Sequence, residues 1–448
     1  MTTLMLFCAA SVLAAPAEVN WQAGAAKVVI TPTEPLWMSG YSSRDKPSEG
    51  ALHDLWTKAL VLVDPAGGRV ALVTLDLCGI DRALADRIKG QLADKYGLPP
   101  ERVALCCSHT HTGPVVGDNL RAMYFLDDEQ QRRVAAYTVR LESAVVEAVG
   151  RAIDDLSPAA ISWGNGQATF AVNRRNNREA DVPKLRAEGK LAGPVDHQVP
   201  VLAVRAAVDG HLRAIAFGYA CHATVLSFYQ FSGDWPGFAQ IELEQAHPGA
   251  VALFWAGCGA DQNPLPRRTV ELAAEYGRQA ARAVDDVLGA PMSPIGGSLS
   301  VKLAHVELPF ANVPTHEQLV ADSSAADKYE ASRARLLLAA YERIGRIAST
   351  YPYPVQTWQL GDGPSWVLLG GEVVVDYSLR LAAEHRPGRT WVAGYANDVM
   401  AYIPSRRVLV EGGYEGGGAM VYYGLPSPWA LPVEELIVGE VHRQLAGQ

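Results

Sequence analysis

The stretch Ser108-His109-Thr110-His111-Thr112-Gly113 follows an apolar run at residues 103–107 and ends before Pro114. Such a run is typical of a short buried strand, and Gly-Pro is a turn signal. Residues two apart on an extended chain point the same way, so the pattern predicts that both imidazoles face one side of the sheet's end. Imidazole is the commonest protein ligand for metals. The stretch therefore indicates a strand that ends in a metal centre or, as the alternative, in a solvated polar turn.

Strand and helix patterns alternate around this stretch. Residues 70–77 form an apolar strand pattern, and residues 82–96 and 130–154 have the apolar spacing of amphipathic helices. Strand patterns continue beyond them, interrupted by a polar loop at residues 173–193 of the kind that can line a site. We expect an α/β (mixed α+β) fold of layered sheets with flanking helices. No repeat, low-complexity tract or linker divides the chain, so we expect a single compact domain over residues 18–448.

The composition limits the function classes. The chain has 448 residues, of which 49% are hydrophobic, with 39 Lys and Arg against 48 Asp and Glu and a net charge of −9. It can bury a substantial core, and an acidic chain without a basic run is a poor nucleic-acid binder. No uninterrupted apolar stretch is long enough to span a bilayer, so no transmembrane helix is expected in the mature chain.

The first 17 residues resemble a secretory signal peptide. Residues 4–15 are apolar and lead into the small-residue segment Ala15-Pro16-Ala17. A buried first strand or helix is the alternative, because no Lys or Arg precedes the apolar run. We expect a secreted or periplasmic protein. Its remaining cysteines are expected as buried free thiols: Cys78, Cys106, Cys107, Cys221 and Cys258.

Three further strand ends lead to a polar side chain that can ligate a metal. His222 follows one strand pattern, Glu372 follows another through Gly370-Gly371 and is expected to begin a helix, and Tyr402 follows a polar turn. Taken singly, each residue has an ordinary explanation: His222 as a core histidine, Glu372 as a partner of the helix dipole, and Tyr402 as a packing residue. In open α/β sheets, however, sites assemble at strand ends.

In their order along the chain, these segments resemble the catalytic domain of the neutral (non-lysosomal) ceramidases. The resemblance covers most of residues 25–425, without the family's C-terminal immunoglobulin-like domain. It rests on residues 50–60, 108–114, 173–174, 222–224, 233–239, 259–264, 371–372, 397–402 and 414–417.

The resemblance implies a zinc ion bound by His109, His222, Glu372 and Tyr402. It also implies three substrate-facing catalytic residues: His111, Arg174 and Tyr414. His111 would donate a proton to the departing amine, and Tyr414 would hydrogen-bond a developing oxyanion. The implied activity is a zinc-dependent amidohydrolase that cleaves the N-acyl amide of a lipid such as ceramide, by metal-activated water, to a sphingoid base and a fatty acid. A deep apolar slot for two alkyl chains is expected beside the metal.

Two alternatives stay open. The segment around Tyr402 and the Arg- and Glu-rich loop at residues 176–193 depart from the family pattern, so the same centre could act on another amide or an ester. The other alternative is an exported, non-catalytic protein that binds a lipid or a glycan through tryptophan-rich edges. The expected partner is a lipid or other small-molecule amide substrate. A membrane surface is a candidate peripheral contact, and nucleic acid is not expected as a partner. The sequence predicts no oligomeric state.

Overall fold

The computed structural model describes residues 21–446. The expected mixed α/β fold of layered sheets and flanking helices is confirmed. The predicted signal peptide, residues 1–17, lies outside the described residues.

The larger sheet has nine strands in the order β4-β3-β2-β1-β5-β7-β8-β9, with β11 paired to β5. Neighbours are antiparallel except for β3 with β4 and β8 with β9. The bounds are β1 Trp21–Val29, β2 Trp56–Val63, β3 Arg69–Leu75, β4 Val103–Cys107, β5 Ser157–Gln167, β7 Gln198–Ala206, β8 Leu212–Tyr219, β9 Val251–Ala256 and β11 Ser293–Pro294. The first and last strands approach each other, since β4 contacts β9. A bridge between Thr110 and Ala223 joins the segments that follow β4 and β8.

The smaller sheet has four strands in the order β12-β13-β14-β16, namely Leu299–Pro309, Thr350–Leu360, Ser365–Leu369 and Thr390–Ala393. One of its faces packs against the larger sheet through Trp358, Trp366 and Trp391, which meet Trp255 of β9. The ring centroids of Trp255 and Trp366 lie 5.2 Å apart. With Trp235 also buried, these tryptophans form core and not the exposed edges that the binding-protein alternative requires.

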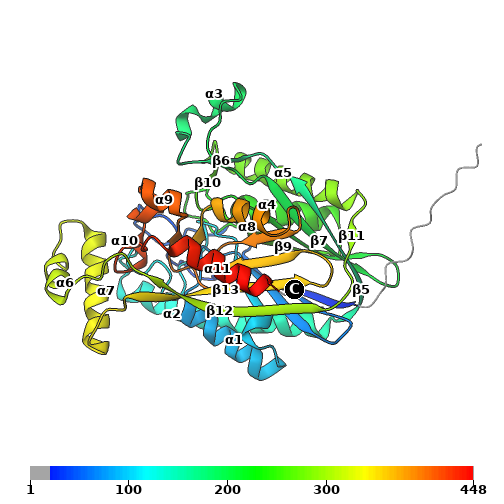
Figure 1. The fold of residues 1–448 in the computed structure, drawn as a ribbon, viewed down its shortest axis with the longest axis horizontal. Helices are drawn as coiled ribbons and strands as arrows, with labels where there is room; N and C mark the ends of the chain where they lie inside the picture. Colours follow the sequence, from blue (N-terminus) through cyan, green and yellow to red (C-terminus); the bar gives the residue numbers. More distant parts are fainter. Residues whose placement is uncertain (1–20, 447–448) are drawn as a thin grey trace, which may run out of the picture.

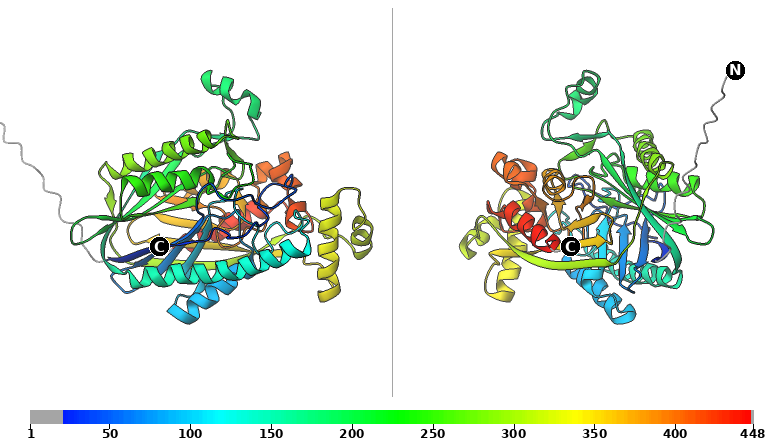
Figure 2. Two further views of the ribbon diagram at one scale, coloured as in Figure 1. Left: turned by 180° about the vertical axis from the view of Figure 1, so that it is seen from behind. Right: turned by 45° about the vertical axis from the view of Figure 1, so that its right-hand side comes forward.

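Helices cover the outer faces. Helices α1 (Arg82–Tyr96), α2 (Asp128–Asp154), α4 (Asp234–Ala246) and α5 (Val270–Leu288) pack on the larger sheet, and α8 (Asp376–Glu384) and α11 (Val433–Leu445) on the smaller one. Helix α11 lies in front in Figure 1, and α2 in front in the view from behind in Figure 2. Local signals set the ends: Asp81 caps the first turn of α1, and Gly97 ends it in the left-handed conformation. No helix within residues 21–446 is long and apolar enough to cross a membrane.

The remaining elements are short or project from the body. Helix α3 (Val182–Ala187) and the pair α6 (His316–Asp322) and α7 (Lys328–Ile344) stand away from it in Figure 1. The predicted polar loop at residues 173–193 thus contains a helical turn and α3. The other short elements are β6 (Ala171–Asn173), β10 (Gln262–Pro264), β15 (Glu372–Val373), β17 (Tyr402–Ile403), α9 (Arg406–Glu411), the π-helical turn at residues 414–418 and α10 (Met420–Tyr423).

Candidate metal centre and adjoining cavity

His109 and His111 lie directly after β4, in a loop that the chain fixes by hydrogen bonds. The side chains of Thr110 and Thr112 each donate to the carbonyl of Ser232 at 2.8 Å. His109 has a φ of +59°, so the backbone is not extended there and the predicted reason for the pairing of the imidazoles was wrong. The rings nevertheless meet, with centroids 4.7 Å apart.

His222 follows β8 and is held from both sides. Its Nδ1 lies 2.6 Å from the carbonyl oxygen of Gly259, and its own carbonyl accepts a hydrogen bond from Trp235 Nε1 at 2.8 Å. Gly259 is required because a Cβ there would lie 2.7 Å from the backbone nitrogen of Cys221. These contacts fix the direction of the imidazole, and its Nε2 points toward the loop of His109.

Glu372 and Tyr402 are register partners in a parallel pair of two-residue strands, β15 and β17. The expectation that Glu372 begins a helix was wrong, since α8 begins at Asp376. Gly371 before it has a φ of +72°, and a Cβ at that position would lie 2.7 Å from the carbonyl oxygen of Ala401. A glycine therefore lets the two strands approach closely enough to bring a carboxylate and a phenol together.

The carboxylate of Glu372 receives both imidazoles on one oxygen. Its Oε2 lies 3.1 Å from His109 Nε2 and 3.2 Å from His222 Nε2, and all three side chains are buried. The ligand atoms of this trio lie within 4.8 Å of one another. The Tyr402 hydroxyl lies 3.4 Å from His222 Nε2, and His111 Nε2 lies 3.0 Å from His109 Nε2. The structure thus brings together the four predicted ligands and His111, which come from four distant parts of the chain.

The chemistry of these atoms fits a cation. The Nδ1 atoms of His109 and His222 lie 2.6 Å from the carbonyl oxygens of Cys78 and Gly259, which assigns the protons of the neutral rings to Nδ1. Two Nε2 lone pairs and the carboxylate oxygen of Glu372 then converge with no proton between them. A divalent ion held by two imidazoles, a carboxylate and a phenol satisfies all of them, and this is a donor set that zinc accepts.

Without an ion, the cluster needs a proton for charge balance. Burial opposes a charged imidazole, but the Glu372 carboxylate outweighs it and raises the pKa of His109 to about 10. Burial raises the pKa of Glu372, yet His109 and His222 hold it well below its usual range. Burial and the Arg174 guanidinium lower the pKa of His222 to about 4. Without an ion, the additional proton therefore lies on His109 Nε2 and faces the Glu372 carboxylate, where a cation would replace it.

A cavity of about 480 Å³ adjoins His111 and Tyr402. The predicted substrate-facing residues Arg174 and Tyr414 both line it. Arg174 donates to Glu415 at 2.7 Å and to the Tyr402 hydroxyl at 3.1 Å, and the ring of Tyr414 lies 5.2 Å from that of Tyr402. Most of the residues that line it are polar or charged, which differs from the apolar slot expected for two alkyl chains.

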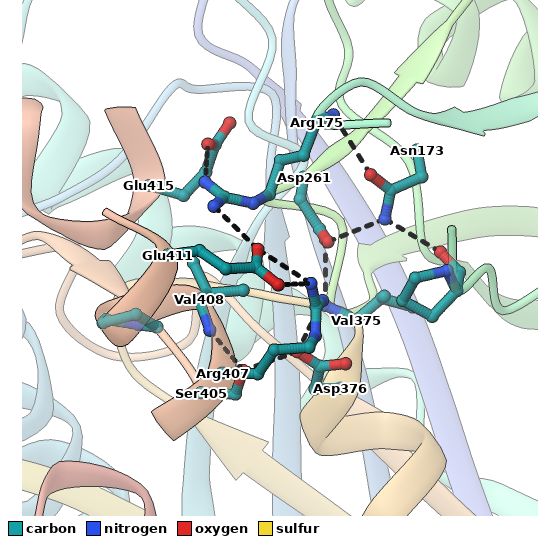
Figure 3. A network of polar contacts seen from close by, with 12 residues as sticks. Asn173, Arg175, Asp261, Val375, Asp376, Ser405, Arg407, Val408, Glu411 and Glu415 are labelled. Atoms are coloured by element: carbon teal, nitrogen blue, oxygen red, sulfur yellow. Dashed lines mark hydrogen bonds and ion pairs between the residues drawn. The ribbon is translucent and has the colours of Figure 1, made fainter. Parts of the chain in front are cut away.

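A network of ion pairs and hydrogen bonds supports this wall of the cavity (Figure 3). Arg175 contacts Glu415 at 2.7 Å and Glu411 at 3.0 Å. Asp261 accepts hydrogen bonds from the Asn173 side chain and from the backbone of Val375, each at 3.0 Å. Residues 173–175 are thereby tied both to the turn that carries Tyr414 and, through Asp261, to the segment directly after the strand that carries Glu372.

The sequence motifs do not include every residue at the centre. The Tyr423 hydroxyl hydrogen-bonds Oε1 of Glu372, and the Tyr41 ring packs edge-on against His111 with centroids 4.8 Å apart. Neither tyrosine lies at a recognisable spacing from the residue that it contacts. Cys78 was predicted as a buried free thiol, and it is one; its carbonyl and Sγ both lie next to His109. All five cysteines of the described residues are buried and free, as predicted.

The sequence matches one family. The family described as "Neutral/alkaline non-lysosomal ceramidase, N-terminal" matches residues 21–260. Neutral ceramidase of Pseudomonas aeruginosa is 28% identical over 271 residues, which are 56% of this chain and 39% of that protein. Neutral ceramidase 2 of Arabidopsis thaliana is 23% identical over 265 residues, which are 57% of this chain and 33% of that protein. The matched part of the chain thus corresponds to less than two fifths of the length of these relatives.

Solved structures give the same result for the fold. The crystal structure of neutral ceramidase from Pseudomonas aeruginosa superposes with a TM-score of 0.70 at 21% identity, over 95% of this chain and 75% of that one. A structure described as ceramidase complexed with C2 gives a TM-score of 0.71 at 20% identity. At this level of identity, the likeness establishes the shared fold.

Proposed function

The chain belongs to the neutral/alkaline non-lysosomal ceramidase family, and from that membership we propose that it is a zinc-dependent hydrolase that cleaves the N-acyl amide of a lipid such as ceramide. The observation that carries the proposal is the convergence of His109 and His222 on one oxygen of Glu372. Three buried ligands beside a cavity form the ligand set of a catalytic zinc site, with room for a labile fourth ligand.

His109, His222 and Glu372 would hold the ion, and Tyr402 would be the fourth ligand. When bound, zinc would lower the pKa of a water molecule to about 7 and polarise the amide carbonyl. Burial raises the pKa of the Tyr402 hydroxyl well above its usual value, and the Arg174 guanidinium, which hydrogen-bonds it, offsets part of this rise in favour of the phenolate. A weakly basic phenol can also leave its ligand position when substrate binds.

His111 is the proton-transfer group of this proposal. Its Nε2 lies beside the metal ligands and its side chain lines the cavity, while its Nδ1 is buried without a hydrogen-bond partner among the described residues. Hydrolysis adds water across the C–N bond: the acyl carbon keeps the oxygen, and the amine nitrogen takes a proton. Burial lowers the pKa of His111 well below its usual value, so the ring starts neutral; it can take the proton that the attacking water loses and deliver it to the nitrogen as the bond breaks.

Tyr414 and Arg174 act on the carbonyl oxygen and on the position of the tyrosines. The Tyr414 side chain is 45% exposed, so its hydroxyl is accessible to a substrate in the cavity and can donate to a developing oxyanion. The Arg174 guanidinium lies 5.8 Å from the ring centroid of Tyr402 and 5.7 Å from that of Tyr414. It holds both phenols at the same edge of the cavity.

The proposal extends to the setting of the enzyme. Residues 1–17 would direct export to the periplasm or medium, residues 18–448 would form one metallohydrolase domain, and a lipid substrate would be met at a membrane surface. Hydrolysis of another amide or an ester by the same centre remains the second candidate, because the charged lining of the cavity favours a polar substrate.

The test compares His222→Ala with His247→Ala. His247 is a partly exposed surface histidine that pairs with Asp285 at 2.7 Å, so it controls for loss of a histidine elsewhere. We expect near-stoichiometric zinc and amide hydrolysis in the wild type and in His247→Ala, and neither in a folded His222→Ala protein. Hydrolysis by metal-stripped His222→Ala would refute the proposed centre, and zinc without hydrolysis of any amide or ester would favour the binding protein.

A further inference from the structure

The cavity beside His111 has an excess of positive charge. Four arginines line it, against two glutamates, so the lining residues alone carry two guanidinium charges in excess; Glu411 and Asp181, outside the lining, contact two of these arginines. Among the residues that line it in the described chain, Leu265 alone has an aliphatic side chain. The arginines are Arg174, Arg175, Arg178 and Arg267, and the glutamates are Glu179 and Glu415. A lining of this kind matches an anion better than an uncharged lipid with two alkyl chains.

Three of the arginines have carboxylate partners within hydrogen-bond distance, and the fourth, Arg178, does not. Arg174 and Arg175 both bind Glu415, at 2.7 Å in each case, and Arg175 also contacts Glu411. These pairs fix the wall of the cavity that carries Tyr414. The charges of Arg174 and Arg175 are largely compensated, so the anion attraction must come from Arg178 and from the donor of Arg267 that Glu179 leaves free.

Arg178 and Arg267 retain donors for a ligand. The Arg178 side chain is 89% exposed, and its ion-pair contact is a 4.0 Å approach to Asp181. Arg267 holds Glu179 through Nε and Nη2, and its Nη1 makes no hydrogen bond to a described residue. Arg178 and Glu179 belong to the polar segment that the sequence marked as a site-lining loop. That segment thus brings cationic donors to the cavity that His111 lines.

We infer that this cavity binds an oxyanion, a carboxylate or a phosphate, on the amine half of the substrate, so that anionic N-acyl amides are cleaved in preference to uncharged ceramide. The acyl half of such a lipid is hydrocarbon, which leaves the amine half for a polar cavity. A guanidinium group binds a carboxylate or phosphate with two parallel hydrogen bonds, which an alcohol cannot accept in the same way. The catalytic part of this inference rests on the proposed amide hydrolysis, whereas anion binding does not.

The experiment uses two amides that differ only at the head group. N-lauroylglycine has a carboxylate where N-lauroylethanolamine has a neutral alcohol. N-lauroyl-phosphoethanolamine has a phosphate at the same end and tests that anion. A short-chain ceramide is assayed as the uncharged lipid substrate. We expect kcat/KM for the glycine or phosphoethanolamine amide to exceed that for the ethanolamide by at least about tenfold, a typical value for one charge-assisted hydrogen bond. The preference should fall as salt concentration rises.

Variants of opposite charge test the assignment to these residues. Arg178→Gln and Arg267→Gln should each reduce the ratio of anionic to neutral kcat/KM, and Glu179→Gln should increase it. Arg278→Gln is the matched control because Arg278 is a half-exposed surface arginine that pairs with Glu275 on its own helix. A ratio that changes as much in Arg278→Gln as in Arg267→Gln would overturn the assignment.

A binding measurement separates this inference from the proposed function. Isothermal titration calorimetry of N-lauroylglycine and N-lauroylethanolamine into metal-free wild-type protein needs no turnover. Tighter binding of the glycine amide, weakened in Arg267→Gln, supports the anion site even if no amide is hydrolysed. Equal affinity for both, or ceramide hydrolysis that exceeds that of both anionic amides, overturns the inference and leaves the amidohydrolase proposal intact.

Discussion

The Tyr423 hydroxyl donates a hydrogen bond to Oε1 of Glu372, although 51 positions separate the two residues. The other oxygen of the same carboxylate faces His109 and His222. Because Oε1 is held by a neutral donor, the carboxylate cannot rotate without losing that bond, and Oε2 stays directed at the imidazoles. Tyr423 therefore orients a proposed metal ligand without contacting the ion itself.

Replacing Tyr423 with phenylalanine should weaken zinc binding while the fold is kept. Loss of a partner that orients a ligand typically costs about 10- to 100-fold in metal affinity. Competition with a chromophoric chelator measures the affinity. Tyr422→Phe is the control, because the preceding tyrosine packs in the same apolar cluster, and no hydrogen bond of its hydroxyl to a described residue is present. Equal zinc affinity in the two variants would show that Tyr423 has no orienting role.

Much of the site was predictable because its residues follow strands. The apolar runs before His109, His222 and Glu372 predict strand ends, and such ends meet in layered α/β folds. The polar segment after Asn173 was also recognisable as a candidate site wall. Local patterns were therefore enough to make these residues candidates, and the resemblance to the ceramidases supplied the full set of four ligands, Tyr402 included.

The geometry was not predictable, because contacts between distant segments override local preference. The left-handed backbone of His109 depends on a loop held by Ser232, and the pairing of Glu372 with Tyr402 depends on two strands of two residues each. Strands this short have no periodicity to detect. The hydrogen bond from Tyr423 and the charge of the cavity likewise appear only when segments far apart in sequence are placed together.

Zinc should raise the melting temperature of the metal-free protein through the carboxylate of Glu372. An ion present at about 1,000 times its Kd stabilises the native state by about 4 kcal/mol if the unfolded chain does not bind it. In Glu372→Gln we expect the zinc-dependent rise, followed by scanning calorimetry, to be less than half that of the wild type. Glu384→Gln is the control, because Glu384 pairs with Arg380 and His442 at the surface. An undiminished rise in Glu372→Gln would exclude this carboxylate as a ligand.

Two glycine-to-alanine changes should have opposite effects on stability. A Cβ at Gly277 of α5 would lie 2.5 Å from the Cβ of Phe238 and 2.9 Å from the backbone nitrogen of Ala239, so α4 would have to shift. Overpacking of this kind costs about 1–3 kcal/mol. A Cβ at Gly439 of α11 meets no atom within 4 Å, and alanine there should add about 0.5–1 kcal/mol through helix propensity.

Denaturant unfolding at neutral pH measures both glycine variants. Because both changes add one methyl group to a helix, their difference isolates the contact between α4 and α5. A stability of Gly277→Ala that is equal to or greater than that of Gly439→Ala would contradict the close approach of the two helices.

Lys89 should make stability depend on pH above neutrality. Its side chain is buried although it belongs to α1, and burial lowers its pKa from 10.5 to about 8 against the attraction of Asp86. Below pH 8 both the native and unfolded states hold the proton, and the cost of the buried charge is present in full. Between about pH 8 and 10.5 the native state loses the proton first, so the unfolded state binds more protons and the free energy of unfolding rises with pH from this group.

Methionine keeps the shape of the Lys89 side chain without its charge. Lys89→Met should therefore stabilise the protein at pH 7 by about 2–3 kcal/mol, and by clearly less at pH 10, where the wild-type lysine is already neutral in the native state. Denaturant unfolding at the two pH values gives both differences, and Lys95→Met, at an exposed position of the same helix, controls for the change of surface charge. A gain for Lys89→Met that is the same at pH 7 and pH 10 would mean that the buried ammonium carries no cost, and that the gain comes from packing alone.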